Sequence, residues 1–154
     1  MTLRDVVGAC CGLILALLAP AQARNAGYDP ARDPARDLET AVKQAQHDGK
    51  RILLVVGGEW CGWCHTLEIY LKTETDVHAA WSAGFVTLKV NFSPQNENRS
   101  FLSRYPDIRG YPHIFVLDRD GKFLHSQNTA ELESGSSYSK EKMMQFISKW
   151  RPAQ

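Results

Sequence analysis

The sequence predicts an α/β domain with about four strands flanked by helices. Two observations support this prediction. Helical spacing of apolar residues alternates along the chain with short runs rich in β-branched and aromatic residues. The first of these runs is aliphatic for five consecutive positions, which is typical of a strand that is covered on both faces. The chain shows no internal repeat and no second domain, so a single core is expected.

The first 23 residues predict a secretory signal peptide. They contain Arg4, an apolar run that ends at Leu18, and a small-x-small pattern at 21–23 that is typical of a cleavage site. The apolar run is shorter than the roughly 20 residues that a membrane span needs. An uncleaved anchor remains the second interpretation, because the region before the apolar run carries one positive charge balanced by Asp5. We expect export, to the periplasm if the host is a Gram-negative bacterium.

Composition limits the partners. The formal net charge is +1, which favours neither nucleic acid nor any other strongly charged polymer. Of the four cysteines, Cys10 and Cys11 lie in the predicted signal peptide. Cleavage would leave only Cys61 and Cys64, in an oxidising compartment where their redox state matters from the moment of folding.

The expected elements follow in order from residue 24. Residues 24–36 hold Pro30 and Pro34 among alternating charges, and predict a flexible lead-in that buries nothing. The domain then occupies residues 37–154, with Asp37 as the N-cap of a helix that stops at Gly49. The further elements expected are a buried strand at 51–58, helices at 65–73 and 75–84, an alternating strand at 85–92, a short helix at 97–105, a turn and strand at 108–118, a hairpin at 118–121 into a strand at 122–127, a polar connection at 128–138 and an amphipathic helix at 140–150.

Residues 57–68, GGEWCGWCHTLE, place two cysteines three apart and follow the second with a histidine. A strand that ends in two glycines delivers Cys61 to the start of a helix, where free backbone N–H groups and the helix dipole stabilise an anion. The thiolate is the nucleophile in disulfide exchange, so Cys61 gains reactivity there. Cys64 lies one turn further on, where it can attack a mixed disulfide on Cys61 and release the partner. The pattern predicts a dithiol redox couple.

A structural disulfide, a zinc site and a haem site agree less well with the same sequence pattern. A structural disulfide closing about four residues would contribute only about 2 kcal/mol, against about 3 for a 15-residue loop. Zinc would need ligands beyond the two cysteines, such as His47 or His113. The strongest rival is c-type haem, because Cys61, Cys64 and His65 satisfy C-x-x-C-H. Haem would require a largely helical apolar cavity and a distal ligand such as Met143 or Met144, whereas this motif follows a buried strand.

Several local sequences together resemble the thioredoxin family. Residues 59–64 are similar to the family's WCGPC motif with Trp63 in place of proline, residues 109–112 resemble its cis-proline loop, and Gly121-Lys122 fits the hairpin that follows. The resemblance covers residues 38–150. It implies a thioredoxin-like fold with a central mixed β-sheet of about four strands flanked by helices, and an exported thiol–disulfide oxidoreductase. A further alternative is a thioredoxin-like module that binds partners without redox turnover. The intact cysteine pair argues against this alternative.

The resemblance also implies roles and partners. Cys61 and Cys64 would be catalytic with no cofactor beyond their own disulfide and no metal, and Tyr111 with a cis Pro112 would shape a peptide site. The expected substrates are protein thiols and disulfides, with a redox partner in the membrane; we expect a monomer. The direction of electron flow is not predicted, because neither a donor nor an oxidase is encoded in this chain.

The remaining candidates surround the motif. Trp60 and Trp63 could form an apolar contact rim with Gly62 between the cysteines, although Trp60 could equally pack on the domain. His65 lies four residues after Cys61 on one helical face, so its imidazolium could stabilise the thiolate; the alternative is an ordinary exposed helix residue.

One position departs from the family. Where thioredoxins carry a buried aspartate that is thought to move the proton of the second cysteine, this chain has Val55. Glu59 and Glu68 are the nearest acidic candidates for that task, Glu68 being four residues beyond Cys64 on the same helix. The proton acceptor for Cys64 is therefore left open by the sequence.

Overall fold

The structure is a computed structural model of the chain, and it describes residues 26–153. The predicted signal peptide at 1–23, the alternative of an uncleaved anchor, and Cys10 and Cys11 all lie outside the described residues. Within residues 26–153, none of the helices combines the length and the apolar character needed to cross a membrane.

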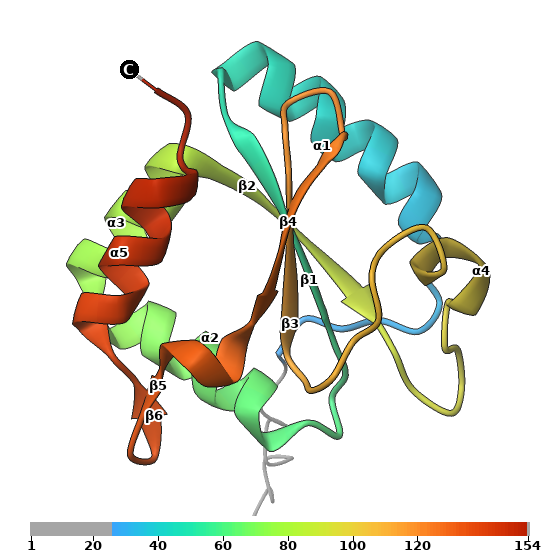
Figure 1. Ribbon diagram of the computed structural model, residues 1–154. Coiled ribbons are helices and arrows are strands. Elements are labelled where there is room, and N and C mark those ends of the chain that lie inside the picture. Colours follow the sequence, from blue (N-terminus) through green and yellow to red (C-terminus); the bar gives the residue numbers. More distant parts are fainter. Residues whose placement is uncertain (1–25, 154) are drawn as a thin grey trace, which may run out of the picture.

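Four strands form the central sheet, in the order β2-β1-β3-β4 (Figure 1). Strand β1 (Arg51–Gly57) runs parallel to β2 (Phe85–Asn91) and antiparallel to β3 (His113–Leu117). Strand β4 (Phe123–Asn128) then pairs antiparallel with β3 at the edge. The sheet is therefore mixed and four-stranded, which confirms the predicted fold class.

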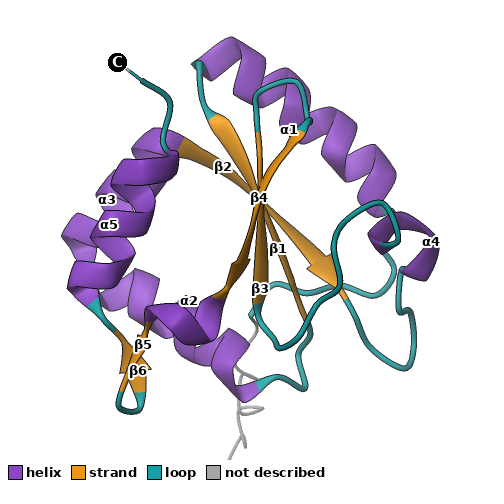
Figure 2. Ribbon diagram, in the orientation of Figure 1, coloured by secondary structure: helices purple, strands orange, loops and turns teal. Residues whose placement is uncertain are grey.

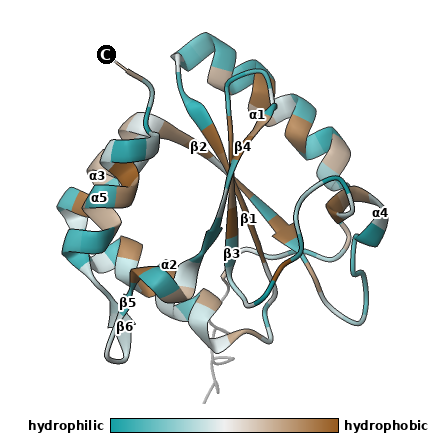
Figure 3. Ribbon diagram, in the orientation of Figure 1, coloured by the Kyte–Doolittle hydropathy of each residue, from teal (hydrophilic) through white to brown (hydrophobic). Residues whose placement is uncertain are grey.

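Helices cover both faces of this sheet (Figure 2). Helix α1 (Pro34–Asp48) and the short α4 (Arg99–Leu102) lie on one face, and α2 (Gly62–Thr73), α3 (Thr75–Gly84) and α5 (Lys140–Trp150) lie on the other. Because side chains alternate along a strand, β1 sends Leu53 and Val55 into the core beneath α2, α3 and α5. Ile52, Leu54 and Val56 pack beneath α1. The apolar strands between two layers of helix are visible in Figure 3.

Helix α1 begins earlier than predicted. Its N-cap is Asp33, whose carboxylate accepts hydrogen bonds from the backbone N–H groups of Ala35 and Arg36. Pro34 is the first helical residue, a position where proline is favoured because its missing N–H would have no partner inside the helix. The predicted N-cap Asp37 was wrong: it lies inside the first turn and pairs with Arg32 at 2.7 Å.

The prediction that residues 24–36 bury nothing was also wrong for the part that the structure describes, residues 26–36. Ala26 and Tyr28 are buried, with 1% and 5% of their surface exposed. The carboxylate of Glu59 accepts hydrogen bonds from the backbone N–H groups of both residues, at 2.9 and 2.8 Å. A partner about thirty residues away thus orders a segment whose own composition favours disorder.

The polar connection at 128–138 contains structure that the sequence pattern did not predict. A 3₁₀ turn, η1 (Thr129–Leu132), leads into a two-stranded hairpin of β5 (Glu133–Ser134) and β6 (Ser137–Tyr138). Leu132 and Tyr138 are buried there against the core beneath α2 and α5. The hairpin matters for the site because Tyr138 contacts the helix that carries the cysteines.

Candidate active site

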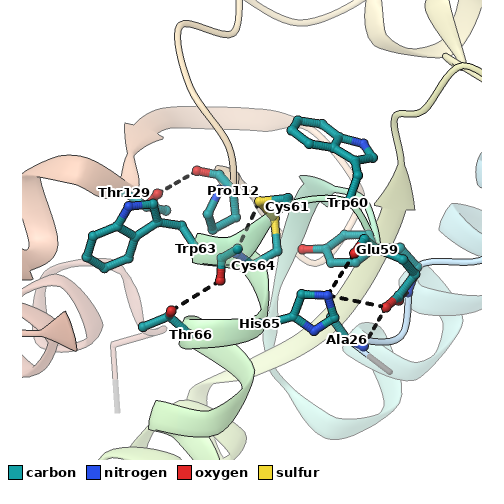
Figure 4. Close-up of a disulfide and its surroundings, with 12 residues drawn as sticks. Ala26, Glu59, Trp60, Cys61, Trp63, Cys64, His65, Thr66, Pro112 and Thr129 are labelled. Atoms are coloured by element: carbon teal, nitrogen blue, oxygen red, sulfur yellow. Dashed lines mark hydrogen bonds and ion pairs between the residues drawn. A yellow bond between two sulfur atoms is a disulfide. The ribbon is translucent and has the colours of Figure 1, made fainter. Parts of the chain in front are cut away.

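The two cysteines of the motif are joined by a disulfide at the start of α2 (Figure 4). Cys61 is the N-cap residue, with extended backbone, and its sulfur accepts a hydrogen bond from the backbone N–H of Cys64 at 3.1 Å. Both residues are buried, with 4% of Cys61 and 2% of Cys64 exposed. The two cysteines therefore differ little in solvent exposure. They differ in position, because Cys61 lies at the helix terminus and Cys64 lies one turn inside the helix.

The local electrostatics favour an anion at Cys61. Helix α2 extends over 12 residues, and its first turn contains no acidic side chain. The free N–H groups at its start and the helix dipole are thus not opposed by a neighbouring negative charge within that turn. A sulfur that carries negative charge during exchange is stabilised at this place.

The loop before β3 lies against the disulfide. The peptide bond between Tyr111 and Pro112 is cis, and Pro112 lies beside the two sulfurs (Figure 4). The hydroxyl of Thr129 donates a hydrogen bond to the carbonyl oxygen of Pro112. This contact links the loop next to the sulfurs to η1.

Aromatic side chains border the site on one side. Trp60 is 55% exposed, meets Tyr111 edge to face at 5.4 Å between ring centroids, and donates its indole N–H to the carbonyl oxygen of Phe92 at 2.7 Å. The ring of Phe92 stacks on Tyr111 at 5.2 Å. We call Trp60, Phe92 and Tyr111 the aromatic rim. Trp63, in contrast, packs inward against Tyr138 at 5.6 Å.

His65 is directed at Glu59 (Figure 4). Its Nε2 lies 2.8 Å from the carbonyl oxygen of Glu59 and 3.7 Å from a carboxylate oxygen of the same residue. The ring therefore links the first turn of α2 to the loop that precedes Cys61. Stabilisation of the Cys61 thiolate by the imidazolium stays a prediction, and the contact with Glu59 was not anticipated from the sequence.

The two acidic candidates have other partners. Glu59 binds the N-terminal segment, defined here as residues 26–28, through both carboxylate oxygens. Glu68 forms ion pairs with Lys89 and with Lys72. Burial alone would raise the pKa of Glu68, but hydrogen bonds and charge from these two lysines outweigh it and lower the pKa.

Tyr28 is a site residue that the sequence did not reveal. It packs in one buried cluster with Ala26, Cys61 and Cys64. Its hydroxyl and the sulfur of Cys64 both crowd Gly57: a Cβ atom at that glycine would lie 2.9 Å from the hydroxyl and 2.5 Å from the sulfur. The signal available in the sequence was one aromatic residue within a polar segment, which is too weak to indicate a contact with the motif.

Comparison with known proteins agrees with this geometry. The model of the thioredoxin-like family matches residues 33–119, more than half of the chain. The chain belongs to this family. The match includes both cysteines, the loop with Pro112 and the first three strands of the sheet.

Individual relatives of this thioredoxin-like chain are redox proteins by name. The thiol:disulfide interchange protein DsbD of Colwellia psychrerythraea is 29% identical over 104 residues, which cover 66% of this chain and 17% of that protein. The corresponding DsbD of Actinobacillus pleuropneumoniae is 29% identical over 97 residues, 62% of this chain and 16% of that protein. The thioredoxin-like chain therefore spans a small part of these relatives.

Solved structures extend the likeness over most of the chain. A disulphide isomerase from Xylella fastidiosa Temecula1 superimposes with a TM-score of 0.69 and 26% identity, covering 81% of this chain and 96% of that chain. The C-terminal domain of DsbD from Neisseria meningitidis, in its oxidised form, gives a TM-score of 0.55 at 21% identity and covers 77% and 97% of the two chains. The second likeness concerns the fold alone. Family, fold and the Cys61–Cys64 disulfide together support thiol–disulfide exchange at this site.

Proposed function

We propose that this protein is a thiol–disulfide oxidoreductase that exchanges disulfides with protein substrates through Cys61 and Cys64. The observation that carries the proposal is the disulfide itself: it joins the N-cap residue of α2 to a cysteine one turn inside the helix, beside a loop that a substrate chain can approach. A pair placed in this way has a nucleophile at the positive end of a helix and a resolving thiol within reach of it.

The reaction proceeds in two exchanges. In the reducing direction, the Cys61 thiolate attacks a substrate disulfide, forms a mixed disulfide and expels one substrate thiolate, which takes up a proton. Cys64 then attacks the sulfur of Cys61 and releases the second substrate thiol. The substrate gains two electrons and two protons, and the pair ends as the disulfide. The reverse sequence oxidises a substrate dithiol, and the reduction potential of the pair relative to its partners decides the direction.

The surroundings suit an extended peptide substrate. Trp60, the exposed member of the aromatic rim, offers an apolar surface near the disulfide, and Pro112 lies beside the sulfurs. Trp60 and Tyr111 would contact the substrate, whereas Trp63, Gly62 and His65 shape the turn that holds the cysteines. Both sulfurs that thioether bonds to haem would require are joined to each other, so this arrangement favours exchange over haem attachment.

We place this chemistry outside the cytoplasm. Residues 1–23 would direct export and be removed, residues 37–154 would form the redox domain, and a Gram-negative periplasm is the compartment that fits best. A redox partner in the membrane would reduce or oxidise the pair after each turnover; the thiol:disulfide interchange named for the DsbD relatives is chemistry of this kind. The proposed enzyme acts as a monomer, without cofactor or metal and without nucleic acid.

The proposal is tested by exchange with a disulfide-bonded peptide. Purified protein, reduced and freed of reductant, should convert the peptide to its dithiol form and become oxidised itself, as followed by mass spectrometry after acid quenching. The matched control is the double variant Cys61→Ser, Cys64→Ser. A wild-type rate no higher than that of this control contradicts the proposed function, as does a Soret band that survives denaturation.

A further inference from the structure

The N-terminal segment places a tyrosine hydroxyl next to the resolving sulfur. Tyr28 is 5% exposed and packs with both cysteines. Its hydroxyl oxygen and the sulfur of Cys64 lie 2.9 and 2.5 Å from one point, the position that a Cβ atom on Gly57 would take. The hydroxyl and the sulfur therefore share the space beside Gly57, and only a residue without a side chain leaves room for both.

The ring is held in place by its own segment. Glu59 fixes the backbone of Ala26 and Tyr28 with a hydrogen bond to each N–H group. The ammonium of Lys89 donates to the carbonyl oxygen of Ala26 and lies 5.5 Å from the centroid of the Tyr28 ring. The Tyr28 ring is thus held in place by four contacts, two made by Glu59 and two by Lys89.

Burial and the neighbouring acidic groups keep the phenol of Tyr28 neutral. Burial raises the pKa of Tyr28 far above its usual range, and the facing groups Tyr138, Glu68 and Glu59 raise it further; the positive group facing the ring is Lys89. A neutral phenol has an O–H proton to donate. It is a poor proton acceptor in this environment, so its useful role is that of a hydrogen-bond donor.

The carboxylates near the motif do not fill this role. Glu59 is engaged with the backbone of the N-terminal segment, and Glu68 is engaged with Lys89 and Lys72. Val55 is an apolar core residue, at the position where the resemblance to thioredoxins implies an aspartate. Cys64 therefore lacks an acidic neighbour at that position, while Tyr28, from a different part of the chain, packs in the same buried cluster as Cys64.

We propose that the Tyr28 hydroxyl stabilises the thiolate of Cys64 during the resolving step, by donating its O–H hydrogen bond to that sulfur. The inference rests on the proposed thiol–disulfide exchange. In this step Cys64 loses its proton, its sulfur bonds to the sulfur of Cys61, and the bond from Cys61 to the substrate breaks. The departing substrate thiolate takes up one proton, so the net change needs no external acid or base. Tyr28 keeps its own proton throughout.

The first test measures the ionisation of Cys64 in the full-length Cys61→Ser protein. Alkylation by iodoacetamide is followed against pH by mass spectrometry of the peptide that contains Cys64, which separates it from Cys10 and Cys11. Adding Tyr28→Phe, which keeps the ring and removes the hydroxyl, should raise the pH midpoint by about one unit, the effect of losing one charge-assisted hydrogen bond. The matched control is Tyr70→Phe, since Tyr70 is equally buried and its hydroxyl has no hydrogen-bond partner among the described residues.

The second test measures the resolving step in protein that retains both cysteines. After rapid mixing of the reduced protein with a disulfide-bonded peptide and acid quenching, the Tyr28→Phe mixed disulfide should decay about threefold more slowly than the wild-type adduct. The thiolate fraction of Cys64 falls about tenfold, but a thiolate of higher pKa is the stronger nucleophile. Formation of the mixed disulfide, measured in a Cys64→Ser background, should be unchanged. An unchanged decay rate or an unchanged alkylation midpoint overturns the role of Tyr28 while leaving the proposed function intact. If the wild-type protein forms no adduct at all, the proposed function fails and the role of Tyr28 fails with it.

Discussion

Replacing Gly57 by alanine tests the packing behind the disulfide. The added Cβ would lie 2.5 Å from the sulfur of Cys64 and 2.8 Å from Cζ of Tyr28, closer than either atom tolerates. Neither neighbour moves easily, because the sulfur is bonded to Cys61 and Tyr28 is tied to Glu59 through its backbone. Overpacking of this kind costs about 1 to 3 kcal/mol. We expect the upper part of that range, reduced by the smaller entropy that alanine has in the unfolded chain, for a net loss of about 2 kcal/mol.

The assay is thermal unfolding of the oxidised protein followed by circular dichroism. A loss of about 2 kcal/mol lowers the midpoint by roughly 6 to 10 °C in a domain of this size. Gly62→Ala is the matched control, since nothing lies within 4 Å of a Cβ atom at that glycine and alanine is the better helix former. Its midpoint should stay equal to that of the wild type or rise slightly. Equal midpoints for Gly57→Ala and the wild type would refute the close approach of Tyr28 and Cys64.

Three further predictions concern the surroundings of the disulfide. Glu59→Ala should destabilise the protein by about 1 to 2 kcal/mol, because two backbone N–H groups lose a charged acceptor that is partly exposed. The amide hydrogens of Ala26 and Tyr28 should then exchange faster with solvent, and unchanged exchange rates contradict this prediction. Burial lowers the pKa of His113 from 6.5 to about 4, so the unfolded chain takes up the proton first, and about 3 kcal/mol of stability should be lost as the pH falls from about 6.5 to about 4. Urea unfolding should show that His113→Gln flattens this dependence, and equal slopes refute it. His65→Ala should raise the pH at which the Cys61 thiolate forms, because an imidazolium one turn away can no longer stabilise it. The titration is followed by thiolate absorbance, and an unchanged curve contradicts this role and leaves His65 only its contact with Glu59.

The elements that follow from local pattern were predicted well. The aliphatic run of β1 and the alternating pattern of β2 are local features, so both strands could be predicted without knowing the contacts of the rest of the chain. Helix α5 spans the residues expected from its amphipathic spacing. The start of α1 differs from the prediction because proline, which disrupts the interior of a helix, is favoured at the first helical position.

The motif in the sequence located the cysteine pair at the start of α2, but not the residues that pack behind it. The cysteines lie three residues apart, so their pairing at a helix start is a local property. The contact between Tyr28 and Cys64 joins segments 36 positions apart and depends on Glu59, Lys89 and the bare backbone of Gly57. Nothing in the composition of residues 26–36 indicates such partners, which is why a polar, proline-containing segment was expected to bury nothing.

The division of labour between the cysteines is the central claim, and trapping of mixed disulfides tests it most directly. Cys61→Ser and Cys64→Ser proteins are purified from cells after acid quenching and compared on non-reducing gels, with reduction of a parallel sample as the control. Cys64→Ser keeps the nucleophile and lacks the resolving thiol, so it should accumulate adducts with substrate proteins that collapse on reduction. Cys61→Ser should trap almost none, because the remaining thiol lies inside the helix, away from its positive end. Equal trapping by both variants would contradict the assigned roles, and no adduct with either would contradict exchange with protein substrates.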